Sequence, residues 1–395
     1  MKICLINNLY PPYARGGAEQ VVRQAVEGLQ QAGQQVVLIT SAPNGAWTET
    51  DGRVIIYRLR PANLFYYPAA GEHGWVVRAI WHLLDIFNFS VARQVREILQ
   101  KEKPDIVHTH NLMGLSFLIP RVVRKLGRRH IHTVHDVQLA EPSGIILKAK
   151  EHSWRYRGGL SQMYQWVMRW LLGSPDVVVS PSQFLLDFYT QRRFFPQAKK
   201  VVLRNPITFP LVAESEHDFR DGPCRFLYLG QLEEHKGVMF LRQMAADLLA
   251  AGEKLELHIV GSGSQLATLQ SLAKDTPAII IHGRKEREDL PSFLQQMDVM
   301  VVPSLCYENS PTVIFESLSV GTPVLASHIE GIEELVSAPN GIMTFVAGDP
   351  QALKEKMRWC MQNRSELAEM GRAARSTVPA LPASEYVHRL LSLYG

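Results

Sequence analysis

The segment 299–326 restricts the fold of this chain more than any other part of it. It begins with the apolar run Val299–Val302, continues through a polar loop and a helical segment, and ends in a second apolar run that opens at Pro323. Strands joined by helices in this way belong to a parallel, doubly wound sheet, which binds ligands at the carboxyl ends of its strands. The pattern therefore predicts an α/β fold with a ligand site in the loop before the helix.

The start of that helix is a candidate phosphate site. Ser310 is a good N-cap, Pro311 suits the first helical position, and Gly321 suits the exit. A helix N-terminus offers unpaired N–H groups and a positive dipole end to a phosphate. Glu308 precedes this terminus, and Glu316 lies in an apolar run inside the helix, where a carboxylate needs a polar partner. Two glutamates around one phosphate suit a nucleotide-sugar, unless both are merely solvated.

Both halves of the chain repeat the alternation of strands and helices, and 395 residues are too many for one core. We therefore expect two domains, residues 1–205 and a second that begins at residue 206. The strands predicted in the first half are residues 2–7, 35–40, 54–59, 106–109, 130–134, 177–180 and 200–203. Those predicted in the second half are residues 225–229, 255–260, 278–282, 299–302 and 323–326.

Charge is divided between the two halves. Residues 1–205 hold 26 Lys and Arg against 14 Asp and Glu, a balance of +12, whereas residues 206–395 have a balance of −8. This asymmetry indicates an anionic membrane surface or a phosphorylated acceptor as partner of the basic half, or simple attraction between the domains. No nucleic-acid-binding motif accompanies the charge, so nucleic acid is not a predicted partner. Four separated cysteines and the lack of a run of ~18 apolar residues predict a cytoplasmic protein.

The segment 303–327 closely resembles the C-terminal signature of the retaining GT-B glycosyltransferases, glycosyltransferase group 1 or family 4, with glutamates eight positions apart. The resemblance implies two Rossmann-like domains with parallel sheets facing across a cleft. The first, residues 1–205 with a final helix in 380–395 that crosses back, would bind the acceptor, and residues 206–379 would bind the donor. It assigns Glu308 to the donor sugar and Glu316 to the ribose hydroxyls. It also assigns four intervening residues to the sugar and pyrophosphate: Asn309, Ser310, Pro311 and Thr312.

Two further loops match this family. Gly16 and Gly17 permit close backbone approach before the first helix and resemble the glycine loop that reaches the donor phosphate. Lys236 offers a positive charge to the departing pyrophosphate, in a segment resembling the family's Gly-Arg-Leu…Lys-Gly; a surface lysine is the alternative. Gln231 stands where that segment commonly has arginine, so a second cation is missing there.

Strand ends supply the remaining candidates. His135 follows the predicted strand 130–134 and resembles the family's histidine at the donor sugar and reacting centre. Gly261, Ser262 and Arg284 follow strands of the second half and are predicted to contact the nucleotide, Arg284 through the base. Further histidines are interpreted as core residues rather than metal ligands, because no carboxylate pair accompanies them: His108, His110, His130 and His132.

Two aromatic, basic stretches of the first half have two possible interpretations. One runs from Asn63 to Trp81 and the other from Trp154 to Trp170. Aromatic side chains with arginines suit a lipid-linked or interfacial acceptor. They suit equally a helical lid packed on the domain.

The resemblance thus implies a retaining, metal-independent hexosyltransferase of polysaccharide biosynthesis that uses no cofactor and has a nucleotide-sugar as donor substrate. Its predicted catalytic residues are Glu308, His135 and Lys236. A glycan or lipid-linked acceptor of the cell envelope is the expected second substrate, with the inner face of the membrane as a candidate location. A GT-B-fold epimerase or phosphorylase, and a non-catalytic nucleotide-sugar-binding subunit, are the alternatives.

Overall fold

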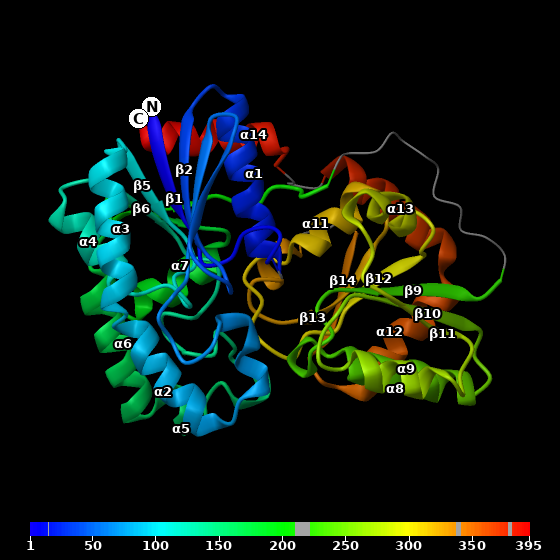
Figure 1. Cartoon of the computed structure of the whole chain (residues 1–395). Coiled ribbons are helices and arrows are strands. Elements are labelled where there is room, and N and C mark those ends of the chain that lie inside the picture. Colours follow the sequence, from blue (N-terminus) through cyan, green and yellow to red (C-terminus); the bar gives the residue numbers. More distant parts are fainter. Residues whose placement is uncertain (15, 210–221, 337–340, 378–380) are drawn as a thin grey trace. The chain divides into compact units, whose positions relative to one another are not determined.

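The computed structural model describes residues 1–14, 16–209, 222–336, 341–377 and 381–395. The chain divides into two compact units, which are described separately here (Figure 1). Unit 1 comprises residues 1–144, 152–206 and 381–395, and unit 2 comprises residues 145–151 and 207–380. The sequence analysis placed the first boundary at residue 205 and did not separate residues 145–151 from the first domain. Its other boundary, at residues 379 and 380, lies outside the described residues.

Unit 1 contains an eight-stranded sheet in the order β3-β4-β2-β1-β5-β6-β7-β8. Its strands are β1 (Lys2–Ile6), β2 (Gln35–Ser41), β3 (Trp47–Asp51), β4 (Val54–Leu59), β5 (Ile106–Thr109), β6 (Arg129–Thr133), β7 (Val177–Ser180) and β8 (Lys199–Val202). Its helices are α1 (Gly17–Gln31), α2 (Trp75–Ile86), α3 (Phe89–Glu102), α4 (Ile119–Lys125), α5 (Trp154–Arg157), α6 (Gly159–Leu172), α7 (Gln183–Gln191) and α14 (Ala383–Tyr394).

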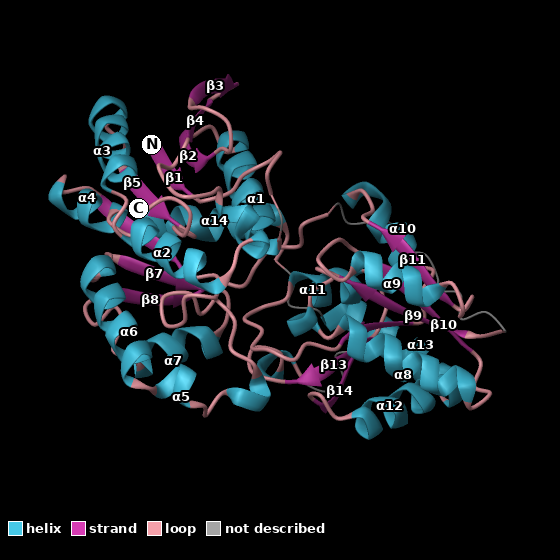
Figure 2. Ribbon diagram, turned by 60° about the horizontal axis from the view of Figure 1, so that its bottom comes forward, coloured by secondary structure: helices cyan, strands magenta, loops and turns pink. Residues whose placement is uncertain are grey.

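Unit 2 contains a six-stranded parallel sheet in the order β11-β10-β9-β12-β13-β14. Its strands are β9 (Cys224–Leu229), β10 (Leu255–Val260), β11 (Ile279–Gly283), β12 (Val299–Val302), β13 (Val324–His328) and β14 (Ile342–Val346). Its helices are α8 (Val238–Ala250), α9 (Leu266–Ala273), α10 (Leu290–Leu294), α11 (Thr312–Ser319), α12 (Pro350–Gln362) and α13 (Arg364–Thr377). Helices alternate with strands along both units (Figure 2).

The predicted fold class, α/β with two Rossmann-like domains, is confirmed. Every predicted strand is present, with ends that agree within two residues. The expectation of a wholly parallel first sheet is wrong at β3, which pairs antiparallel with β4. The sequence of β3, Trp-Thr-Glu-Thr-Asp, has no apolar run, because this strand lies at the sheet edge and is mostly exposed.

Each sheet has one point at which the strand order reverses. In unit 1 this point lies between β1 and β5, and in unit 2 it lies between β9 and β12. At such a point the loops that follow the two adjacent strands run to opposite faces of the sheet. Their separation opens a crevice for a ligand at the carboxyl ends of the strands. In unit 2 the loops in question carry Lys236 and Glu308.

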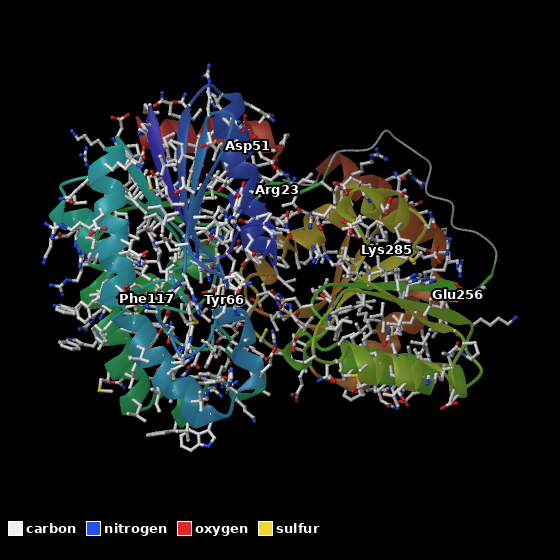
Figure 3. All side chains as sticks on the ribbon, viewed as in Figure 1. Arg23, Asp51, Tyr66, Phe117, Glu256 and Lys285 are labelled. Atoms are coloured by element: carbon white, nitrogen blue, oxygen red, sulfur yellow. The ribbon has the colours of Figure 1, made fainter. Side chains whose placement is uncertain are left out.

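Helix α14 completes the core of unit 1. Its residues Val387 and Tyr394 are buried with side chains of α1 and β1. Figure 3 draws the side chains on the ribbon of both units. The Tyr394 hydroxyl lies 2.8 Å from Nδ1 of the buried His108. A Cβ atom on Gly28 of α1 would lie 2.3 Å from Val387 Cγ2, so glycine is what allows the two helices to approach this closely.

Candidate functional site

Lys236 and Glu308 meet at the strand-order reversal of unit 2. The loop after β9 ends in a 3-10 turn at Glu234–Lys236, and Glu308 lies in the loop after β12. Lys236 Nζ lies 2.7 Å from Glu308 Oε1, which also accepts a hydrogen bond from Ser304 Oγ at 2.6 Å. Burial acts to lower the pKa of Lys236, but the Glu308 carboxylate outweighs it and the pKa is raised. The lysine is therefore held as a cation next to a carboxylate.

Two glycines with positive φ hold these loops close to neighbouring backbone. Gly237 has φ 73°, and a Cβ atom there would lie 1.9 Å from the carbonyl oxygen of Pro303. Gly331 has φ 80°, and a Cβ atom there would lie 1.7 Å from the carbonyl oxygen of Glu308. Both distances are far below any normal contact, so the position of Glu308 depends on glycine at residue 331. The sequence analysis did not single out Gly331, because an isolated glycine gives no sign of what it contacts.

Glu316 is 1 % exposed inside α11. Its Oε1 atom accepts hydrogen bonds from Arg287 Nη2 and from Thr208 Oγ1, and Arg287 also donates from Nε to the carbonyl oxygen of Thr208 at 3.2 Å. The polar partner that burial of a carboxylate requires is thus an arginine of the same unit. The sequence analysis predicted that Glu316 faces a ligand, named Arg284 of this segment as a contact to the nucleotide base, and missed Arg287. Both follow β11, and only the folded chain decides which one reaches the helix.

The other predicted donor residues of unit 2 lie in loops that follow its strands. The Tyr228 hydroxyl donates to the carbonyl oxygen of Gln231 at 2.5 Å, and Leu232 N donates to that of Ser262 at 2.9 Å. The first bond holds the loop after β9 against its own strand, and the second joins the loops after β9 and β10. Gly261 has φ 150°, and a Cβ atom there would clash with the carbonyl oxygen of Gly230. Arg284 is exposed after β11.

Helix α11 begins one residue later than the sequence predicts. Pro311 is the N-cap rather than the first helical residue, because its ψ of 111° is extended, and the helix starts at Thr312. Asn309 and Ser310 therefore belong to the loop that leads into the helix. The predicted exit is confirmed, since Gly321 follows the C-cap with φ 84°, a value that favours glycine.

Residues 145–151, which interrupt unit 1 in the sequence, pack in unit 2 beside Glu308. Their backbone forms an antiparallel bridge with residues 305–307, including a bond of 2.9 Å from Lys148 N to the carbonyl oxygen of Leu305. The Lys148 ammonium also pairs with the carboxylate of Glu330. The segment that leads into Glu308 is therefore held by residues far away in the sequence.

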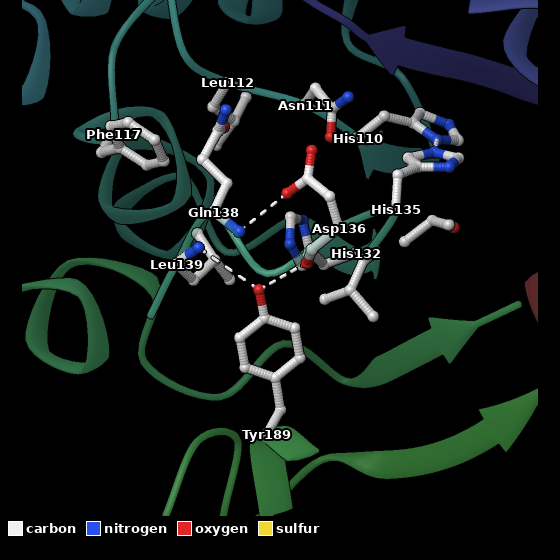
Figure 4. Close-up of a pocket in the computed structure, with 12 residues that line it drawn as sticks. His110, Asn111, Leu112, Phe117, His132, His135, Asp136, Gln138, Leu139 and Tyr189 are labelled. Atoms are coloured by element: carbon white, nitrogen blue, oxygen red, sulfur yellow. Dashed lines mark hydrogen bonds between the residues drawn. The ribbon is translucent and has the colours of Figure 1, made fainter. Parts of the chain in front are cut away.

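Unit 1 has a small pocket at the ends of β5 and β6 (Figure 4). Its volume of about 10 Å³ is close to the space that one water molecule needs. His135 Nε2 lies 2.9 Å from His110 Nδ1, and burial lowers the pKa of His135 to about 4. Burial raises the pKa of the adjacent Asp136 to about 6. At neutral pH His135 is thus an uncharged imidazole that can exchange hydrogen bonds but carries no positive charge.

Gly16 and Gly17 lie at the start of α1 in unit 1. Gly16 is the N-cap, and its N–H group donates to Glu19 Oε2 at 2.7 Å. The buried Glu19 thereby stabilises the helix terminus. Gly16 and Gly17 thus belong to a different unit from the pair of Lys236 and Glu308.

The remaining buried histidines of unit 1 bond to threonine and tyrosine hydroxyls. His108 Nε2 lies 2.7 Å from Thr133 Oγ1, and His130 Nε2 lies 2.8 Å from Thr109 Oγ1. Within the described ranges, histidines, cysteines and carboxylates form no group of three placed to hold a metal ion. A separate search of those ranges for helices with the length and apolar character of a bilayer span found none.

Sequence models of two families match this chain, one in each half. The model of "Glycosyltransferase Family 4" matches residues 15–209, and that of "Glycosyl transferases group 1" matches residues 213–377. A Klebsiella pneumoniae protein described as "Uncharacterized 42.6 kDa protein in cps region" is 29 % identical over 85 % of this chain and 87 % of its own length. Glycogen synthase of Mycobacterium tuberculosis is 25 % identical over 95 % of this chain and 89 % of its own.

Solved structures of glycosyltransferases share the fold. Sucrose-phosphate synthase from Thermosynechococcus elongatus has a TM-score of 0.76 and 21 % identity, over 100 % of this chain and 98 % of its own. Anabaena HepE in complex with UDP has a TM-score of 0.71 and 16 % identity, over 100 % of this chain and 99 % of its own. The predicted GT-B fold is confirmed by these similarities.

Proposed function

Because the chain belongs to the group 1 and family 4 glycosyltransferases, we propose that it transfers a hexose from a nucleotide-sugar to an acceptor hydroxyl with retention of anomeric configuration. The observation that carries this proposal is the pairing of Lys236 with Glu308 at the strand-order reversal of unit 2. That position is where doubly wound sheets bind nucleotides. The solved HepE complexes, which contain UDP and UDP-glucose, support the same class of donor.

In the proposed reaction the two charges of the pair separate when the donor binds. The diphosphate of the donor competes with Glu308 for the Lys236 ammonium, which then neutralises the departing phosphate. The released Glu308 carboxylate faces the anomeric carbon and stabilises its oxocarbenium-like positive charge. The departing phosphate takes the proton of the acceptor hydroxyl, which attacks on the face that the phosphate leaves. The product therefore keeps the configuration of the donor, and no covalent intermediate on the protein is needed.

The other predicted residues have supporting roles in this proposal. Glu316 accepts hydrogen bonds from the ribose hydroxyls of the donor. These bonds replace, or add to, the one that Glu316 accepts from the Thr208 hydroxyl. The loops that contain Gln231, Gly261 and Ser262 enclose the nucleotide. His135, neutral at the pH of the cytoplasm, donates a hydrogen bond to the donor sugar. The proposed acceptor is a lipid-linked or cell-envelope glycan of polysaccharide biosynthesis, at the inner face of the membrane.

The donor site is tested by the Glu316→Ala substitution. We expect the affinity for the matching nucleoside diphosphate to fall by about 1–3 kcal/mol, because the ribose hydroxyls lose their acceptor. Isothermal titration calorimetry measures this, with Glu253→Ala as control, since Glu253 pairs with Arg358 elsewhere in unit 2. Unchanged affinity in a folded Glu316→Ala protein would contradict the assignment.

Metal independence is a separate prediction. Lys236 and the start of α11 supply positive charge to the phosphates, so activity should survive dialysis against EDTA. The measurement is the rate of sugar transfer or donor hydrolysis before and after chelation, with and without added Mg²⁺ or Mn²⁺. Loss of activity that either ion restores would show that the lysine does not replace a metal.

A further inference from the structure

Helix α6 of unit 1 exposes a row of large apolar side chains, although it also buries Met168, Leu171 and Leu172 in the core. Ser161 and Gln165 are buried, and Gln165 Nε2 donates to Ser161 Oγ at 3.1 Å. Four large apolar side chains repeat every three or four residues on the outer face and are 52–65 % exposed: Leu160, Met163, Trp166 and Trp170. These four residues are called the apolar stripe below. The outer face of an ordinary surface helix is polar instead.

Cations from α4 lie at one end of the apolar stripe. The Arg121 guanidinium lies 3.8 Å from the centre of the Trp170 ring. Arg121, Lys125 and Trp170 line an open depression of about 350 Å³, together with Arg124. Arg124 itself donates to the carbonyl oxygen of Leu171, which leaves the exposed Lys125 and the stacked Arg121 to face a ligand. Residues 152–175 include no Asp or Glu, so no acidic side chain of α5 or α6 opposes an anionic partner.

The arginines of α5 and α6 are less suited to this role. Arg155 pairs with Glu141 at 3.0 Å, and Arg169 donates to the carbonyl oxygen of Arg192 at 3.1 Å. Both bonds lie within unit 1 and hold the helices in place. Arg157 of α5 is also exposed, but the cations that line the depression beside Trp170 come from α4.

Exposed apolar surface is concentrated in unit 1. Helix α2 adds to it, since Trp75 and Leu83 are 77 % and 63 % exposed while its one acidic residue, Asp85, is buried. Among the described residues of unit 2, three large apolar side chains are exposed, Leu272 and Val336 at 36 % and 39 % and Val346 at 63 %. Unit 1 also holds 25 Lys and Arg against 14 Asp and Glu, a balance of +11. Apolar exposure and positive charge thus occur together in one unit.

We infer that the apolar stripe of α6 docks on an anionic lipid bilayer, with Lys125 and Arg121 on the lipid headgroups. Tryptophan side chains favour the membrane interface, and an amphipathic helix flanked by cations binds there in the plane of the membrane. Exposed apolar surface of this kind marks an interaction site, and the positive rim without opposing acids selects an anionic surface. The inference deepens the proposed function, because a lipid-linked acceptor lies in a bilayer.

Flotation with lipid vesicles tests this inference on the full chain. Wild-type protein should bind phosphatidylcholine vesicles that contain phosphatidylglycerol, and it should bind vesicles of phosphatidylcholine alone at least tenfold more weakly. Binding to the anionic vesicles should fall as salt rises, because ions screen the headgroup charge. Brominated lipids should quench tryptophan fluorescence of the wild-type protein, which tests insertion without any substitution.

Matched variants locate the surface. The pair Trp166→Ser and Trp170→Ser should weaken vesicle binding at least tenfold, and Lys125→Gln severalfold, whereas Val346→Ser on unit 2 should leave it unchanged. Nucleoside diphosphate affinity, measured without lipid, should be the same in all of them, so loss of the donor site and loss of docking are distinguishable. Wild-type binding by the tryptophan pair variant, or equal binding to both vesicle types, would overturn the inference. A solution dimer that the same substitutions dissociate would also overturn it, with a second copy as the occupant.

Discussion

Replacement of Glu308 by glutamine is expected to reduce turnover by about 10²–10³-fold, comparable to the loss of one group that stabilises transition-state charge. The amide keeps the size of the side chain and can still accept the bond from Ser304. It cannot supply the negative charge that the positive anomeric centre requires. Nucleoside diphosphate affinity should be equal or higher, because Lys236 no longer has a carboxylate partner in the free protein. Steady-state kinetics and calorimetry on the same sample measure both quantities.

The Glu253→Gln variant is the matched control for this substitution. Glu253 also forms an ion pair in unit 2, with Arg358 at 3.0 Å. Its replacement removes one charge of the same sign, and turnover should stay within a factor of two or so, as for an ordinary surface pair. Equal losses of turnover in both variants would mean that unit 2 responds to net charge rather than to Glu308.

Alanine at residue 331 is expected to damage both stability and turnover. The added Cβ atom would lie 1.7 Å from the carbonyl oxygen of Glu308, so the two backbones must move apart. The positive φ of 80° adds a cost of about 1–2 kcal/mol for any residue with a side chain. Together the two effects should lower the free energy of unfolding by more than ~3 kcal/mol. Turnover of the remaining folded protein should fall at least tenfold, because Glu308 is displaced.

Gly252→Ala separates the two causes. Gly252 has a similar φ of 86°, at the end of α8, but no atom lies within 4 Å of a Cβ atom built there. This control should show the cost of the backbone conformation alone, about 1–2 kcal/mol, with unchanged turnover. Urea unfolding and the rate per folded molecule give the comparison. If both alanine variants behave alike, contact with residue 331 does not position Glu308.

The sequence was sufficient for the fold because its strands are short, apolar and bounded by turn residues. It also placed Lys236 and Glu308 correctly in loops after two strands, since alternation of strands and helices determines which loops lie at the carboxyl edge. Strand β3 was missed because the prediction relied on apolar runs, and an exposed edge strand need not be apolar. The start of α11 was misplaced by one residue because the ψ angle of Pro311 is not fixed by its ring.

Contacts between distant residues could not be predicted. The sequence indicated that Glu316 needs a polar partner, but Arg287 reaches it only through the path of the chain after β11. The approach of Gly331 to Glu308 and the packing of residues 145–151 in unit 2 also depend on tertiary structure. Periodicity reports the face on which a residue lies, and it does not report what covers that face.

Stereochemistry of the released sugar tests the central proposal most directly. The purified protein is incubated with α-linked UDP-, GDP-, ADP- and dTDP-hexoses, and proton NMR follows the first sugar that slow hydrolysis or transfer produces. Retaining transfer from the proposed donor site predicts that the α-anomer appears first with the accepted donor, and that Glu308→Gln slows its appearance by about 10²–10³-fold. First appearance of the β-anomer would contradict the account.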